Sequence, residues 1–138
     1  MIRSLLLLAL LPLAACGPRV LTMDGTESAA AGATPRLALA RVTQPETQAP
    51  VLELRTSDGA VRTGQLGLLQ PDQAPPSPGG GIPLALRDTT RVLAGRVEAP
   101  DSAPYDCSFR VLNPARGMGG GGAGGCVTAD GTRVDFIY

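Results

Sequence analysis

Short apolar runs with a period of two, bounded by glycine, proline and aspartate, are the feature that most limits the fold of this chain. The 138 residues include 18 glycines and 13 prolines, and beyond Pro35 the apolar residues fall mostly at every second position. This spacing places apolar side chains on one face of a strand. No segment repeats them convincingly at helical spacing. We therefore expect an all-β fold, a small antiparallel sandwich or barrel of about six or seven strands.

Two Asp-Gly pairs, Asp58-Gly59 and Asp130-Gly131, each lie between two alternating segments. An Asp-Gly pair tolerates the positive φ angles that a tight hairpin turn needs, so each pair predicts a hairpin. The expected strands are residues 36–43, 51–56, 60–69, 90–98, 106–111, 127–129 and 132–138.

Two stretches rich in proline or glycine interrupt this pattern, at residues 71–83 and 117–125. We expect the first to be a surface loop within one domain, because the segments on either side are small for independent cores. The second satisfies Gly-x-Gly-x-x-Gly at Gly117, Gly119 and Gly122. A phosphate-binding loop must open a helix, whereas here a strand is expected to follow. We therefore predict a flexible hairpin connection and no bound cofactor.

The N-terminus has three regions: a basic start, the apolar run Leu5–Leu13 and an end of small residues. Nine apolar residues are about half of what a membrane-spanning helix needs, which is typical of a signal peptide. The run ends in Leu13-Ala14-Ala15-Cys16, which resembles the lipobox of bacterial lipoproteins. The resemblance implies that residues 1–15 are removed and that Cys16 carries diacylglycerol and a further acyl chain such as palmitate.

The resemblance also implies a location. Two or three acyl chains anchor a protein stably, so the lipid bilayer is the expected partner of Cys16. Gly17 stands where an aspartate would favour the inner membrane in lipoproteins of the enterobacterial type, and we therefore expect the outer membrane, facing the periplasm. Residues 16–35 are rich in Ala, Thr, Gly and Ser and are expected to be a lipidated, flexible tether to a single domain at residues 36–138.

Two cysteines remain if Cys16 carries lipid. Cys107 and Cys126 are an even pair in an oxidising compartment, where a disulfide is the default. A structural bond is favoured over a redox-active one because the Cys-x-x-Cys spacing is absent. A metal site is disfavoured because two thiolates without histidine would need carboxylate help.

The charged residues exclude several functions. Twelve arginines balance twelve acidic residues, which disfavours nucleic acid as a partner, and the chain has no histidine. Serine-histidine, cysteine-histidine and histidine-metal chemistry are therefore excluded. The acidic residues nearest the expected strands could form a glycosidase-type pair, but a solvated strand face explains each of them. They are Glu53, Glu98, Asp101, Asp106 and Asp135, and the four aromatic residues expected in the core are Tyr105, Phe109, Phe136 and Tyr138.

These observations together predict a protein without catalytic residues, anchored in the outer membrane, that binds an envelope protein or supports an envelope assembly. The alternative is an enzyme, or an enzyme inhibitor, directed at the cell wall in the periplasm. A third hypothesis is a scarcely structured chain dominated by its glycine and proline segments.

Overall fold

The computed structural model describes residues 17–29, 33–45, 47–69 and 91–138. The predicted signal peptide at residues 1–15, the cysteine at position 16 and the predicted loop at residues 71–83 lie outside these ranges. Within them the chain forms nine strands and one short 3-10 helix, which confirms the all-β prediction but exceeds six or seven strands. The elements are β1 (Arg19–Ser28), β2 (Arg36–Gln44), β3 (Val51–Arg55), β4 (Val61–Gln65), β5 (Gly67–Leu69), β6 (Arg91–Ala99), β7 (Ser102–Val111), η2 (Pro114–Gly120), β8 (Gly122–Val127) and β9 (Arg133–Ile137).

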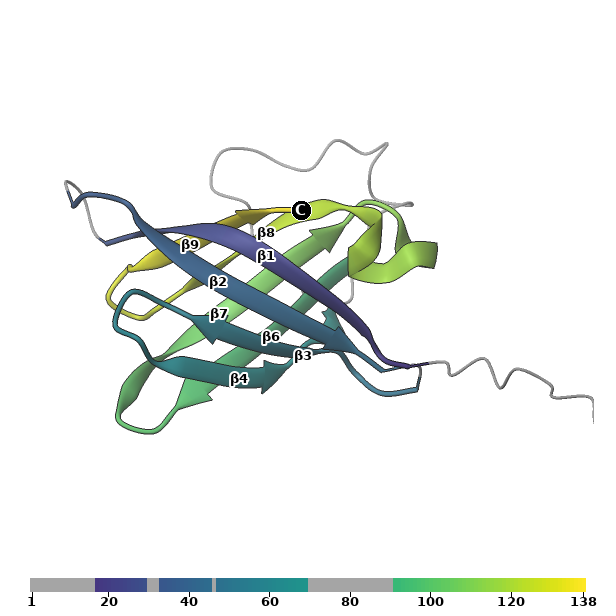
Figure 1. Ribbon diagram of the computed structural model, residues 1–138, viewed down its shortest axis with the longest axis horizontal. Helices are drawn as coiled ribbons and strands as arrows, with labels where there is room; N and C mark the ends of the chain where they lie inside the picture. The colour runs from purple at the N-terminus through teal and green to yellow at the C-terminus, as the bar shows by residue number, and fades with distance from the viewer. Residues whose placement is uncertain (1–16, 30–32, 46, 70–90) are drawn as a thin grey trace, which may run out of the picture.

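The strands form a closed antiparallel barrel, one of the two architectures expected (Figure 1). Their order is β4-β3-β2-β1-β9-β8-β7-β6-β5, and a further pairing of β4 with β6 joins the two sides. Eight strands therefore make a cylinder, and β5 is an extra strand that continues along β6. Closure removes the free strand edges that would otherwise be open to pairing with other chains.

Two glycines allow this closure. A Cβ atom on Gly64 would lie 1.9 Å from the carbonyl oxygen of Arg96, and one on Gly95 would lie 2.0 Å from that of Gln65. At the seam, the place where β4 pairs with β6 and closes the barrel, the two backbones thus approach so closely that only glycine fits on either strand. The seam also explains why the expected strand at residues 60–69 is divided, since β4 pairs with both β3 and β6 while β5 pairs with β6.

The N-terminal strand β1 corrects the predicted tether. Residues 19–28 are not a flexible connection: they pair along their length with β2 and over their second half with β9. Met23, Gly25 and Glu27 face inward, while the residues between them are exposed. The inward set contains one large apolar side chain, so its alternation is weak in the sequence, and pairing with two neighbouring strands decides the conformation.

Side chains fill the interior of the barrel. The inward faces of the strands supply the buried core, in which the Phe109 ring centroid lies 5.9 Å from that of Phe136 and 6.2 Å from that of Tyr138. Tyr105 is also buried, so the prediction that the aromatic residues belong to the core is confirmed. A barrel of eight strands is just wide enough for its own side chains to fill it.

The two predicted hairpins are present, with turns that differ from the expected form. In both turns only the glycine has positive φ, at 80° for Gly59 and 89° for Gly131. The aspartate instead accepts hydrogen bonds: Asp58 accepts one from the Thr56 hydroxyl at 2.8 Å and one from the backbone of Ala60 at 2.9 Å. The second turn repeats this Thr-x-Asp-Gly arrangement around Asp130.

Candidate functional site

The barrel has two ends, each formed by a different set of turns (Figure 1). The far end carries the β3–β4, β6–β7 and β8–β9 turns. The charged residues there are mixed: the acidic Glu27, Asp58, Glu98, Asp101 and Asp130, and the basic Arg36, Arg55, Arg62 and Arg133. The other end, here called the N-terminal end, consists of residues 17–21, 42–44, 49–51, 65–69, 91–93, 110–122 and 137–138. These segments contain four arginines, at positions 19, 91, 110 and 116, and no aspartate or glutamate. Charge in the described residues is therefore distributed unevenly along the barrel axis.

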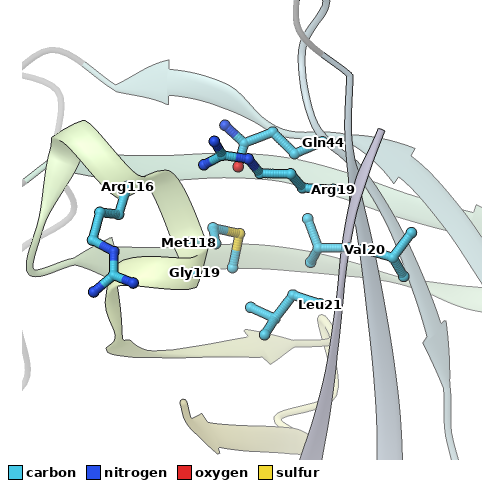
Figure 2. A pocket seen from close by; sticks show the side chains of 8 residues that line it. Arg19, Val20, Leu21, Gln44, Arg116, Met118 and Gly119 are labelled. Carbon is cyan, nitrogen blue, oxygen red and sulfur yellow. The ribbon is translucent and has the colours of Figure 1, made fainter. Parts of the chain in front are cut away.

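A hollow of about 230 Å³ opens at the N-terminal end (Figure 2). Its wall comes from the start of β1, the end of β2 and the helix η2. The lining residues are Arg19, Val20, Leu21, Val42, Gln44, Arg116, Met118 and Gly119. Figure 2 shows Arg19 and Gln44 on one side of Met118 and Arg116 on the other. The hollow thus combines an apolar floor with two guanidinium groups, a combination that suits a ligand with an anionic head and an apolar body.

The glycine-rich segment builds one wall of this hollow. It connects the antiparallel strands β7 and β8, so the predicted hairpin connection is confirmed, but the segment is a 3-10 helix followed by the start of a strand and not an irregular loop. Residues 114–120 form η2, and β8 begins at Gly122. The Leu112 N–H donates to the Gly121 carbonyl at 3.0 Å, and backbone bonds of 2.7 and 3.0 Å join Gly122 to Tyr138. Met118, which is 1% exposed, packs into the core. One apolar side chain and these backbone bonds order a segment whose composition alone suggested flexibility.

The Gly-x-Gly-x-x-Gly pattern falls within this wall. Gly117 and Gly119 lie in η2, and Gly122 opens a strand. A Cβ atom on Gly117 would lie 2.6 Å from the side-chain oxygen of Gln44, so this glycine lets η2 pack against the end of β2. Gly117 and Gly122 therefore have packing roles, whereas a Cβ atom on Gly119 would have nothing within 4 Å.

The far end is closed by a buried polar network of Glu27, Thr56, Asp58, Arg62 and Tyr105. The Arg62 side chain is 3% exposed, and its guanidinium donates to the Thr56 hydroxyl at 2.6 Å and to the Asp58 carboxylate at 2.7 Å. It also lies 5.0 Å from the centroid of the Tyr105 ring, within range of a cation–π interaction. The Tyr105 hydroxyl donates to Glu27 at 3.3 Å.

Hydrogen bonding and burial shift the pKa values of this far-end network. The guanidinium of Arg62 holds the pKa of Asp58 well below its usual range, and the same bond raises the pKa of Arg62. Burial, with the nearby charge of Glu27, raises the pKa of Tyr105 to about 12. Every buried side-chain nitrogen and oxygen in the described residues has a hydrogen-bond partner. The network's donors and acceptors are used within the protein, and its role is to seal the barrel.

Sequence reasoning missed this network. Glu27 falls in the segment predicted to be a tether, and Arg62 falls at an inward position of a strand where a charged residue is not expected. Asp58 was explained by its turn alone. One signal in the sequence could have predicted the network: Arg62 is a charged residue at an inward position of a strand, and a buried charge requires a hydrogen-bonded partner.

The structure brings two of the five candidate acidic residues to the same outer surface and places the other three elsewhere. The register places Glu53 and Glu98 on either side of Thr63, on the outer surface of β3, β4 and β6. Glu53 lies 3.9 Å from Arg41 and lines a second, outward-facing hollow of about 340 Å³.

The other three are accounted for individually. Asp106 is bonded to Arg96 at 2.8 Å, Asp135 is bonded to Arg133 at 2.6 Å, and Asp101 occupies the β6–β7 turn with φ of 57°. Ion pairs on solvated strand faces, or a turn, therefore explain four of the five.

Cys107 and Cys126 form a disulfide, as predicted. They lie directly opposite each other on β7 and β8, with Cα atoms 4.0 Å apart, and both side chains are buried. The bond joins β7 to β8 next to the Asp106–Val127 pair, four residue pairs away from the Val111–Gly122 pair that borders η2, so it fastens the two strands toward the far end of the barrel.

Comparison with protein families, with curated proteins and with solved structures gave no match to this chain. In the described ranges no three side chains of Cys, Asp or Glu gather closely enough to hold a metal ion. None of the helical structure there is long and apolar enough to cross a membrane.

Proposed function

We propose that this chain is a lipid-anchored protein of the bacterial envelope whose barrel acts, without catalysis, by binding or by supporting an envelope assembly at the membrane surface. The observation that carries the proposal is the position of the lipobox cysteine relative to the fold. Cys16 precedes the first residue of β1, Arg19, by three positions. A fully extended chain covers at most about 3.6 Å per residue, so the two Cα atoms are within about 11 Å of each other.

This spacing changes the form of the anchor that the sequence suggested. A tether of about twenty residues would let a domain move freely above a bilayer. With β1 beginning at Arg19, acyl chains on Cys16 would hold the barrel itself at the lipid surface, and its N-terminal end would face the bilayer. Two or three acyl chains are sufficient for stable anchoring of a domain of this size.

The filled interior supports a function on the outer surface and at the ends of the barrel. The carboxylates that would be the first choice for cell-wall hydrolysis are engaged in ion pairs or solvated separately, as described above. A role in binding or support therefore fits the described residues better than chemistry does.

The test begins with localisation. The full chain is expressed in a bacterium that processes lipoproteins, next to a Cys16→Ala variant. We expect the wild-type chain in the outer-membrane fraction, released by detergent but not by high salt, and the variant as an uncut precursor that retains residues 1–15. A wild-type chain that washes off with salt would contradict the anchor.

The second step addresses the activity. Crosslinking in intact cells should join the anchored protein to a defined envelope component in comparable amounts. Turnover of muropeptides by the purified protein, abolished by Glu53→Gln or Glu98→Gln, would instead establish a cell-wall enzyme and refute the non-enzymatic role.

A further inference from the structure

The N-terminal end of the barrel has the composition of a surface that contacts anionic lipid. Its described segments carry four arginines without an aspartate or glutamate, while the far end carries both acidic residues and arginines. Among the described residues, neither Arg19 nor Arg116 takes part in an ion pair. Both are exposed, and they stand on opposite sides of the hollow floored by Met118 (Figure 2). Two guanidinium groups at this end have the chemistry to bind phosphate oxygens.

Exposed apolar side chains accompany these arginines. Val20, next to Arg19, is 49% exposed, and Leu112, which precedes η2, is 57% exposed. Apolar residues beside basic ones are the usual composition of a protein surface that rests in the headgroup region of a bilayer. A soluble anion would use the guanidinium groups but would leave these apolar side chains in water.

We infer that the N-terminal end of the barrel docks on anionic phospholipid, with Arg19 and Arg116 contacting headgroup phosphates and with Val20 and Leu112 inserted at the interface. This inference rests on the lipid anchor proposed above, because acyl chains on Cys16 hold this end, and not the far end, at the bilayer. Docking fixes the orientation of the barrel and presents the far end, where acidic and basic residues are mixed, to the periplasm. Each arginine contributes about fivefold to the equilibrium between docked and undocked orientations.

The test uses the absence of tryptophan from the chain. The full chain is processed in cells, purified from membranes with its lipid and reconstituted into vesicles with brominated acyl chains, either phosphatidylcholine alone or its equimolar mixture with phosphatidylglycerol. Leu112→Trp reports contact at the N-terminal end. Val61→Trp, at an exposed position of the far end, is the matched control.

We expect the fluorescence of the Leu112→Trp variant to be quenched in the anionic vesicles and that of Val61→Trp to be unaffected. Adding Arg19→Gln and Arg116→Gln should lower the docked-to-undocked ratio by about 25-fold. Arg36→Gln with Arg55→Gln, which removes the same charge from the far end, should change nothing. Flotation with the vesicles, measured on every variant, reports the anchor separately.

The outcomes separate the two proposals. Quenching that is equal in neutral vesicles, that survives loss of both arginines, or that is absent from a protein that floats would overturn the docking inference and leave the anchor standing. A protein that neither floats nor carries acyl mass would refute the anchor, and the docking inference would fall with it.

Discussion

Replacing Arg62 by alanine should destabilise the barrel strongly, because it opens the buried network at the far end. The side chain loses charge-assisted bonds to Thr56 and Asp58 and a bond of 2.7 Å from its Nε to the carbonyl of Ala103. Removing one partner of a buried charged pair costs about 3–5 kcal/mol. Asp58 is 50% exposed and regains water, so we expect the lower part of this range, about 3 kcal/mol. In a domain of this size that loss lowers Tm by roughly 12 °C.

The control is Arg96→Ala. Arg96 makes a similar two-bond pair, at 2.8 and 3.0 Å, with Asp106, but both side chains are more than half exposed. An exposed pair contributes little to stability because water replaces it. Urea unfolding of the oxidised chains, followed by far-UV circular dichroism, should show a large loss for Arg62→Ala and almost none for Arg96→Ala. Equal losses in the two variants would refute the argument that burial makes this network important.

Further predictions concern pH, the disulfide and the seam. Because the pKa of Asp58 is lowered in the folded state, its contribution to the free energy of unfolding is complete above the ordinary pKa of 3.8 and is lost as the pH falls through the folded pKa. Asp58→Asn should therefore reduce the loss of stability in acid, measured as the urea midpoint against pH. Burial raises the pKa of both Tyr105 and Tyr138 to about 12, so absorbance at 295 nm should show that they ionise near pH 12 in the folded state. The free energy of unfolding should decline as the pH rises from 10 to 12. Titration of the folded protein near pH 10 would contradict the burial of these side chains. Reducing the disulfide, which spans 19 positions, should cost about 3 kcal/mol, as measured by paired urea curves with and without reductant. Gly95→Ala should lower Tm clearly, because the added Cβ would lie 2.0 Å from the Gln65 carbonyl oxygen, whereas Gly119→Ala, with nothing within 4 Å of its Cβ, should not. Similar Tm values for the two variants in calorimetry would contradict the close approach of β4 and β6.

The sequence predicts the parts of this fold that local rules control. Alternation and Asp-Gly turns identify both hairpins and the all-β class, and cysteine parity identifies the disulfide. These features depend on residues that are close along the chain or on simple counting. The closure of the barrel depends on the pairing of β4 with β6 at Gly64 and Gly95. No local sequence pattern predicts this pairing.

The errors share a physical cause. Residues 19–28 and 117–125 are poor in large apolar side chains, and composition therefore suggested flexible segments. In the structure, backbone pairing with β2, and with β9 over the second half of the strand, orders β1, while the buried side chain of Met118 orders η2. The candidate site at the N-terminal end is built from these two segments and the end of β2, so the sequence could not locate it. Long-range pairing stabilises residues whose local preferences are weak.

The intact mass of the protein extracted from bacterial membranes tests the central claim most directly. The account predicts a single species that lacks residues 1–15, carries the mass of two or three acyl chains at its N-terminal cysteine, and is two hydrogens lighter than its reduced form. An uncut chain of 138 residues without added lipid and with three titratable thiols would contradict it.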